Sequence, residues 1–461
     1  MQSDQKLFSL AKAPLILSLA ITATLSSTLL PLSAQALPLK LQWAKQLGTS
    51  DPNESAEGVA TDSTNNVYIT GFTGGALGGA NKGGSDTWVA KYNNSGTLQW
   101  KNQLGSPGDD YSFAVTTDSK ANIYISGSAC GSVAAIRQLE RNKRSTDSIQ
   151  RAPLRGGHLR FSLTHPGSFR SCNALVAKYN SNGKLQWTKQ LGSSVLDESL
   201  GVATDSTGNI YIAGYTNGDL GGTNKGGSDA WVAKYNSSGI LQWKTQSEIS
   251  TTQLDQTNGI ATDSTGDVYV TGFSGGDIFN PNADQAWIAK YNSRGKLQWK
   301  KQVGTSKQDQ SNGIATDSTG NVYISGFTTG SLGGTNKGSY DAWVAKYNSN
   351  GKPQWTKQLG TAGEDLSNSV TTDSAGNVYL AGATNGSLER TNKGSYDVWV
   401  AKYSNSGTLQ WKKQLGTSDF DSSNSVATDS TSNVYLAGLT DGSLGGANKG
   451  GGDAWVTKYH Q

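Results

Sequence analysis

The chain of 461 residues has little of what most enzymes use, with only two cysteines and three histidines. Two sulfurs are too few to suggest a structural metal site. No nucleophile elbow, metalloprotease helix or phosphate-binding glycine loop occurs, since the Gly-Gly pairs have no helical pattern after them. A lyase or hydrolase usually needs histidines or paired acids that converge on one place. These absences weigh against catalysis.

Long apolar runs are absent after residue 40. Residues 1–36 combine Lys6 and Lys12, an apolar run from Pro14 to about Leu32, and the small-residue ending Ala34-Gln35-Ala36. This order is typical of a secretory signal peptide cleaved after Ala36. The alternative is an uncleaved membrane anchor, because the run is just long enough to span a bilayer. We therefore expect an exported protein, periplasmic, extracellular or at the cell surface, with no membrane span after cleavage.

What the chain does have is a repeat that occurs seven times. Leu-Gln-Trp, with one variant at Pro353, recurs every 56 residues from Trp187 onward, after intervals of 57 and 87. The phrase Gly-Val-Ala-Thr-Asp or a close variant also occurs seven times. Its aspartates are Asp62, Asp118, Asp205, Asp263, Asp317, Asp373 and Asp429. One unit at a fixed period indicates an array whose members bury their apolar faces against one another.

Within each unit the apolar residues alternate with a period of two, as in strands, and no segment after residue 40 shows a helical stripe. The unit containing Trp343 predicts an inner strand A (312–316), then B (321–326) and C (341–347), and the Leu-Gln-Trp segments form an outer strand D. The chain is predicted to be all-β, a seven-bladed β-propeller of four-stranded blades. Because the mature chain opens on a lone D strand, Leu41–Leu47, that strand is expected to complete the last blade and remove the unpaired edges.

Asp-Ser-Thr-Gly-Asn-Val-Tyr-Ile-Ser-Gly (317–326) and Asp-Ala-Trp-Val-Ala-Lys-Tyr-Asn-Ser-Asn-Gly-Lys (341–352) resemble the bacterial seven-bladed β-propeller repeat family, SBBP. The resemblance runs from residue 41 to the end, apart from one insertion in the second blade. It implies the propeller fold in residues 37–461. Such repeats are found mainly in exported or surface proteins of bacteria, and the family implies no single activity.

The aromatic residues have two interpretations. All thirteen tryptophans stand at repeat positions, seven in D strands and six in C strands. We expect them to pack between blades, because aromatics of this size dominate core energetics. The alternative is a ladder of stacking surfaces for sugars.

The B–C loops and D–A connections are longer than the A–B and C–D turns, so function is expected at the end of the ring that they share. An acid precedes each A-strand aspartate by eight residues there. The seven are Glu54, Asp110, Asp197, Asp255, Asp309, Asp365 and Asp421. As a carboxylate ring around the channel mouth they could bind a ligand or a divalent cation, with calcium as the candidate. Alternatively, each accepts backbone N–H bonds within its own connection.

The second blade carries an insertion, 131–171, between its B and C strands. Eight Arg or Lys against two acids give it a charge of +6. The whole chain has a charge of +4, so the chain without the insertion is slightly acidic. It has no interleaved aromatics or nucleic-acid module, so no nucleic-acid partner is expected, and a solvated segment without an essential role is the plainer interpretation. Cys130 and Cys172 flank it and are predicted to form a disulfide, the alternative being two free thiols.

These observations predict a monomeric, exported, non-catalytic scaffold that binds a protein or a cell-envelope or extracellular polymer through its long-loop face, without a resident cofactor. One alternative is a secreted lyase or glycan hydrolase that uses acids at the channel mouth. A further alternative, divalent-cation binding at the carboxylate ring, is compatible with both.

Overall fold

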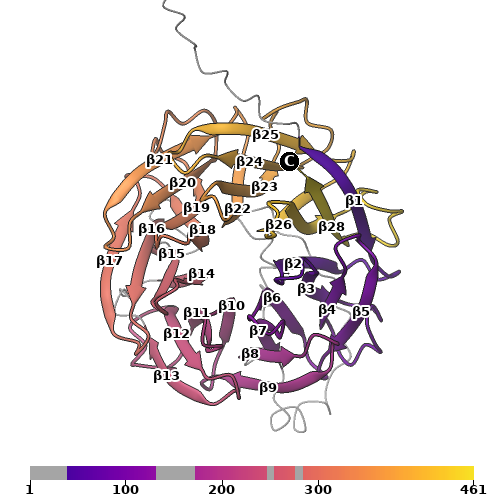
Figure 1. Cartoon of the computed structure of the whole chain (residues 1–461), viewed down its shortest axis with the longest axis vertical. Coiled ribbons are helices and arrows are strands. Elements are labelled where there is room, and N and C mark those ends of the chain that lie inside the picture. The colour runs from indigo at the N-terminus through magenta and orange to yellow at the C-terminus, as the bar shows by residue number, and fades with distance from the viewer. Residues whose placement is uncertain (1–38, 131–171, 247–253, 276–283, 461) are drawn as a thin grey trace, which may run out of the picture. The chain divides into compact units, whose positions relative to one another are not determined.

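The computed structural model describes residues 39–130, 172–246, 254–275 and 284–460. The predicted signal peptide and the insertion 131–171 lie outside these residues. All regular structure that is described consists of strands, which form seven four-stranded antiparallel sheets arranged as a ring (Figure 1). No helix in the described ranges has the length and apolar character needed to cross a membrane. The predicted seven-bladed β-propeller is confirmed.

Each blade uses strands A to D in order from the centre outward. The A strands are β2 (Glu54–Thr61), β6 (Asp110–Thr117), β10 (Asp197–Thr204), β14 (Asp255–Thr262), β18 (Asp309–Thr316), β22 (Asp365–Thr372) and β26 (Asp421–Thr428). The B strands are β3 (Val67–Thr73), β7 (Ile123–Cys130), β11 (Ile210–Thr216), β15 (Val268–Gly275), β19 (Val322–Thr328), β23 (Val378–Thr384) and β27 (Val434–Thr440). The C strands are β4 (Asp86–Tyr92), β8 (Cys172–Tyr179), β12 (Asp229–Tyr235), β16 (Asp284–Tyr291), β20 (Asp341–Tyr347), β24 (Asp397–Tyr403) and β28 (Asp453–His460). The D strands are β5 (Leu98–Leu104), β9 (Leu185–Leu191), β13 (Leu241–Gln246), β17 (Leu297–Val303), β21 (Pro353–Leu359), β25 (Leu409–Leu415) and β1 (Lys40–Leu47).

The N-terminal strand closes the ring. β1 pairs antiparallel with β28, with Trp43 opposite Lys458 and Leu47 opposite Ala454, so the seventh blade has the order β1-β28-β27-β26. In Figure 1 the indigo strand β1 lies beside the yellow blade. The pairing expected from the lone D strand is therefore confirmed, and no blade lacks its outer strand.

The blades are held together by apolar clusters that cross from one sheet to the next. Trp343, Ala345 and Tyr347 alternate along one face of β20 and share a buried cluster with Ile288 of the preceding blade. Trp299 of β17 packs against the same cluster. The prediction that the tryptophans pack between blades is thus borne out for the C strands, and the half-buried D-strand indoles close the outer side of each cluster.

A circle of threonines ties the A strands together around the centre. The hydroxyl of Thr117 donates to the carbonyl of Thr61 at 2.8 Å, and the hydroxyl of Thr61 donates to Thr428 of the seventh blade at the same distance. The corresponding bonds of the other five blades measure 2.8 to 2.9 Å. Seven bonds therefore form a closed circle, which would break if one blade were missing.

The second blade carries the disulfide. Cys130 and Cys172 face each other at the ends of β7 and β8, with Cα atoms 4.0 Å apart and their sulfurs bonded. The predicted disulfide is confirmed. It closes a loop between residues 42 apart in sequence, which corresponds to about 4 kcal/mol of stabilisation by loop-closure entropy.

Candidate functional site

The D–A connections and the B–C loops meet at one end of the ring, called here the long-loop end. In five blade junctions within the described residues, the N–H of the acid that opens the A strand donates to a carbonyl at the end of the preceding blade's B–C loop. Tyr340 pairs with Glu364 in a parallel bridge, and Tyr396 pairs with Phe420 in the same way. The N–H of Asp421 then donates to the carbonyl of Tyr396 at 3.0 Å. Adjacent blades are thereby joined through backbone groups of the very loops that they display.

The seven acids predicted as a ring lie at this end, and each is the first residue of its A strand rather than part of the preceding connection. All seven are buried, with 0 to 3% of their surface exposed. The carboxylate of Asp421 accepts bonds from the N–H and the hydroxyl of Thr417, at 2.5 and 2.8 Å, and from the hydroxyl of Thr440. Asp309 and Asp365 repeat this arrangement. These acids join the D–A connection to the end of the B strand, and their binding of a ligand stays a prediction.

Burial shifts the titration of these acids. It raises the pKa of Glu54, Asp365 and Asp421, although hydrogen bonds to neighbouring Thr residues oppose the shift. Burial raises the pKa of Asp110 to about 6. In the blade of Asp110, Ala129 faces the acid, whereas five other blades have a threonine hydroxyl there. The charged form of Asp110 therefore lacks a donor that its counterparts have.

A second set of buried acids, which the sequence analysis did not single out, opens five of the C strands. They are Asp86, Asp229, Asp341, Asp397 and Asp453, all with no exposed surface. In the first blade, Oδ2 of Asp86 accepts bonds from the N–H of Lys82 at 3.0 Å and from the side chain of Gln103 at 2.9 Å. The only signal in the sequence was the acid that opens each Asp-x-Trp-Val phrase.

The other oxygen of Asp86, Oδ1, is buried and accepts no hydrogen bond. It lies against Gly105, where an added Cβ would come within 2.0 Å of it. The same close approach recurs at Gly48, Gly360 and Gly416. A glycine is therefore required after each of these D strands.

The two sets of acids are neighbours across the blade junctions. The charge of Asp86 adds to the raised pKa of Asp110, and Asp397 has the same effect on Asp421. No group of three or more His, Cys, Asp or Glu side chains with metal-binding geometry occurs within the described ranges. The carboxylates at this end thus meet mainly as pairs from adjacent blades, and calcium binding remains a prediction.

The opposite end of the ring has shorter turns and a different arrangement. Asp429 accepts bonds from both N–H groups and both side chains of Thr431 and Asn433, at 2.7 to 3.0 Å, and from the hydroxyl of Tyr435 at 2.8 Å. The ammonium of Lys458 lies 5.6 Å from the centre of the Tyr435 ring, and Trp43 packs against the same ring. Lys–Tyr contacts of this kind recur in all seven blades.

Hydrogen bonds reverse the effect of burial at these turns. Burial alone would raise the pKa of Asp429, but bonds from Asn433, Thr431 and Tyr435 outweigh it and hold the pKa below its usual value. The same balance lowers the pKa of Asp62, Asp118, Asp205 and Asp317. These carboxylates are therefore structural parts of the turns.

The middle of the A strands makes the inner ring asymmetric. Asn258, Asn312, Asn368 and Asn424 each donate a side-chain N–H to a carbonyl of the next blade, at 2.9 to 3.2 Å. Phe113, Leu200 and Glu57 take the corresponding places in blades two, three and one. Burial raises the pKa of Glu57 to about 7, against bonds from Ser55 and Asn424. One arc of the inner ring is thus polar, and the adjacent arc is apolar.

Aromatic residues outside the repeat pattern gather on the long loops of blades five to seven. Tyr340, Tyr396 and Phe420 are half-buried and are called here the aromatic arc. Tyr340 packs edge-on against Phe327 with ring centres 5.1 Å apart, and Tyr396 and Phe420 are 5.6 Å apart. The hydroxyl of Tyr396 donates to Glu364. The corresponding residues of blades one, three and seven, just before the C strand, are Ser85, Ser228 and Gly452.

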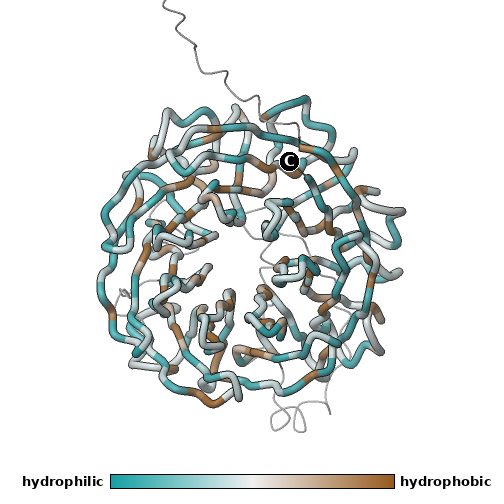
Figure 2. Tube along the Cα trace, viewed as in Figure 1, coloured by the Kyte–Doolittle hydropathy of each residue, from teal (hydrophilic) through white to brown (hydrophobic). Residues whose placement is uncertain are grey.

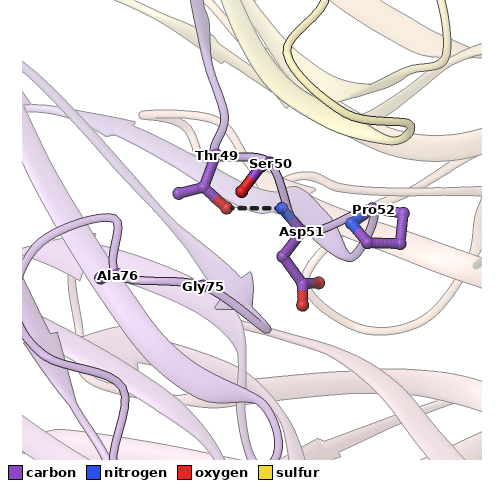
Figure 3. Close-up of a pocket in the computed structure, with 6 residues that line it drawn as sticks. All are labelled: Thr49, Ser50, Asp51, Pro52, Gly75 and Ala76. Atoms are coloured by element: carbon purple, nitrogen blue, oxygen red, sulfur yellow. Dashed lines mark hydrogen bonds between the residues drawn. The ribbon is translucent and has the colours of Figure 1, made fainter.

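A cavity of about 440 Å³ opens beside the first blade (Figure 3). The D–A connection Thr49-Ser50-Asp51-Pro52 lines one side, and Gly75-Ala76 of the B–C loop line the other. The N–H of Asp51 donates to the hydroxyl of Thr49 at 3.1 Å, which fixes the bend of the connection. The cavity is a gap between two pinned loops, with few groups that could hold a specific small molecule.

Seven stretches of the chain match the family described as a β-propeller repeat, SBBP. They are residues 42–78, 99–132, 186–221, 242–280, 298–333, 354–389 and 410–445. The chain belongs to the SBBP β-propeller repeat family. Each match starts in a D strand and continues through strands A and B to the B–C loop, so the seven matches correspond to seven blades.

Two curated relatives are more distant. An uncharacterised WD repeat-containing protein of Acanthamoeba polyphaga mimivirus is 24% identical over 409 residues, which cover 69% of this chain and 28% of that protein. The regulatory protein FlaEY of Caulobacter vibrioides is 22% identical over 404 residues, covering 79% and 40%. The chain thus spans less than half the length of either relative.

Two solved structures share the fold. A chain in the crystal structure of the mitotic checkpoint complex has a TM-score of 0.50 at 11% identity, covering 99% of both chains. The WD40 β-propeller domain of Doa1 has a TM-score of 0.47 at 10% identity, covering 92% of this chain and 98% of that one. At 11% identity the first likeness shows the propeller fold alone.

Proposed function

We propose that this chain is an exported, non-catalytic scaffold that binds a protein partner through its long-loop end. The observation that carries the proposal is the aromatic arc, Tyr340, Tyr396 and Phe420, on the loops of blades five to seven. Tyrosine and arginine are enriched among the residues that dominate protein–protein binding energy. Arg390 and Glu389 lie exposed on the B–C loop between β23 and β24, in the same part of the ring.

The residues of the aromatic arc are held in place by neighbouring groups, so the arc is already formed before a partner binds. The backbone bridges at Tyr340 and Tyr396 hold both loops to the next blade, and Tyr396 is further held by Glu364 and Phe420. Side chains that are already ordered lose little conformational entropy on binding. One solved structure of the same fold is a chain in the mitotic checkpoint complex, which is consistent with such a role. The alternative of a secreted lyase or glycan hydrolase has no comparable support, since the acids at this end are engaged in holding the loops.

Export is part of the same proposal. The N-terminal segment has the composition of a signal peptide, and the Cys130–Cys172 disulfide suits an oxidising compartment. Mass spectrometry of the protein recovered from its native host should show a mature N-terminus at Leu37 and the two cysteines linked. A chain retained in the cytoplasm with Met1 intact would contradict export.

The binding surface is tested with two variants that each carry three substitutions by Ser. In the first, Tyr340, Tyr396 and Phe420 are each replaced by Ser. In the control, Leu98, Leu185 and Leu409, exposed on the outer strands by 38 to 40%, are replaced by Ser. Both proteins are immobilised, and extracts of the host's envelope and secreted fractions are passed over them. We expect the first variant alone to lose a protein that the parent chain retains.

The contrary results are equally specific. If the leucine variant loses the same partner, or if the arc variant keeps it while both variants melt as the parent does, the long-loop end is not the binding surface.

A further inference from the structure

The formal charge of the chain conceals how its charges are distributed. Within the described residues, nineteen Lys or Arg side chains are exposed, but only three acids are: Asp219, Glu389 and Asp419. Most of the remaining acids are the buried carboxylates of the A strands, C strands and turns. The sequence contains 39 basic and 35 acidic residues, so the near balance comes from acids that a partner cannot reach. The accessible surface is strongly cationic.

We define the outer wall as the seven D strands together with the C–D turns between residues 93 and 408. On this wall the basic residues are completely separated from the acidic ones. The D strands contain ten lysines and no Asp or Glu, and the turns add Lys184, Arg294, Lys296 and Lys352 with no acid. The three exposed acids all lie on long loops, at the other end of the strands. Figure 1 places the D strands outermost around the ring, and Figure 2 colours them mainly hydrophilic.

Protection of exposed strand edges explains only part of this pattern. Lysine on an edge strand discourages pairing with another chain, which can account for the D-strand lysines but not for the four cations of the C–D turns. A wall of one sign also repels itself, which disfavours the folded state. Because all fourteen charges of the wall are positive, we infer that the outer wall binds a linear anionic polysaccharide.

The positive charge is densest on the arc formed by β13, β17 and β21. Arg294, Lys296, Lys300 and Lys301 lie within eight residues of one turn and strand and are all exposed. Lys244 precedes them on β13, and Lys352 follows them before β21. An anionic chain that crosses these neighbouring blades would meet cations on each of them, and release of its counterions would favour binding.

Other polyanions fit this wall less well. The D-strand indoles have no open face for stacking on bases: Trp299 packs against Tyr269 on one side, and Gly351 lies so near that an added Cβ would come within 2.9 Å of its ring. The wall is convex around the ring, so a flat membrane would meet the edge of only a few blades. An exposed glutamine in every D strand, such as Gln298, provides amide groups suited to sugar hydroxyls.

The inference concerns a different surface from the aromatic arc, so each can fail without the other. The test uses the mature chain with dextran sulfate, and with uncharged dextran as the matched polymer. The wall variant carries Arg294→Gln, Lys296→Gln, Lys300→Gln and Lys301→Gln. The control variant carries Lys82→Gln, Lys225→Gln, Lys337→Gln and Lys393→Gln, four exposed lysines of the long loops. The insertion 131–171 is the same in both.

We expect the parent chain to bind dextran sulfate but not dextran, with an affinity that falls steeply as salt is raised. The wall variant should lose about tenfold or more in affinity and show a shallower salt dependence, because each lost ion pair removes a released counterion. The control variant should lose much less. Equal losses in the two variants, or no binding of dextran sulfate at low salt, would overturn the inference. A duplex DNA bound as tightly as dextran sulfate would overturn the assignment to polysaccharides.

Discussion

In blades one, two and seven, the two ends of the A strand carry carboxylates whose pKa values are shifted in opposite directions. In blade seven, Asp421 at the long-loop end has a raised pKa, whereas Asp429 at the turn end, eight residues later, has a lowered one. Both are buried, so burial does not distinguish them. The difference lies in the donors: Asp429 accepts two backbone N–H groups, an amide and two hydroxyls, while Asp421 accepts fewer bonds and faces Asp397.

The comparison distinguishes the turn end, where the carboxylates are fully hydrogen-bonded, from the long-loop end, where they accept fewer hydrogen bonds. At the turns each carboxylate receives its hydrogen bonds from its own blade, so the same arrangement can recur in every repeat whatever the sequence of the adjacent blade. At the long-loop end the acids meet across blade junctions, where the connections differ from blade to blade. Variation in sequence is therefore tolerated at the end that displays the loops, as expected of a rigid scaffold that varies its binding groups.

The largest expected difference between the ends is in the stability of alanine variants. Asp429→Ala removes the acceptor for five hydrogen bonds and leaves the hydroxyl of Tyr435 with only its longer contact, 3.4 Å, to Oδ1 of Asn94. We expect it to lower the free energy of unfolding by about 3 kcal/mol. Asp421→Ala should cost only about 1 kcal/mol, because the bonds lost are offset by removal of a desolvated charge. Urea denaturation of the two variants measures both values, and equal losses would break the comparison.

A smaller effect is expected in the dependence of stability on pH. A carboxyl whose pKa is raised on folding stabilises the folded state at low pH, and that contribution is lost as pH rises through the folded value. For Asp110 the loss falls between its usual pKa of 3.8 and about 6, and for Glu57 between 4.5 and about 7. The lowered pKa of Asp429 works oppositely, since its contribution is present above 3.8 and is lost at lower pH.

The melting temperature should therefore decline between about pH 4 and pH 7. The double variant Asp110→Asn with Glu57→Gln should flatten this decline, with a gain on the order of 1 kcal/mol at pH 8. Asp429→Asn serves as the control, because it should leave the decline in place and weaken the fall in stability below pH 4. If the double variant keeps the decline of the parent chain, the raised pKa values are not its cause.

The sequence predicted the architecture more fully than the candidate site, and particular residues show why. The phrase around Trp343 and the lone strand Leu41–Leu47 carried the number of blades, the order of strands and the closure, because these depend on short alternating patterns. The A strand was predicted to begin at residue 312 and begins at Asp309, since Asp309 already pairs with Thr328. That pairing depends on the B strand nineteen residues away and has no local signature.

The features missed by the sequence analysis depend on contacts between strands and between blades. Asp86 at the start of a C strand is buried against Gly105 and held by Gln103, both at the end of the following D strand. The polar and apolar arcs of the inner ring depend on one A-strand position that varies among Asn, Glu, Phe and Leu. Analysis of one repeat at a time shows the framework that all blades share. It does not show the differences between adjacent blades that make the inner ring asymmetric.

The smallest expected effect is that of calcium on the long-loop acids. If Glu54, Asp110, Asp197, Asp255, Asp309, Asp365 and Asp421 formed a cation site, millimolar calcium would raise the melting temperature by mass action. Asp365 and Asp421 are instead occupied by hydrogen bonds from Thr361 and Thr417, and calcium usually requires six or more oxygen ligands. We therefore expect the melting temperature to move by less than about 1 °C, with no heat of binding in calorimetry. A clear heat that disappears in a variant with Asp365→Asn and Asp421→Asn would show that the carboxylate ring binds cations, because Asn can still accept the bonds that hold the connections.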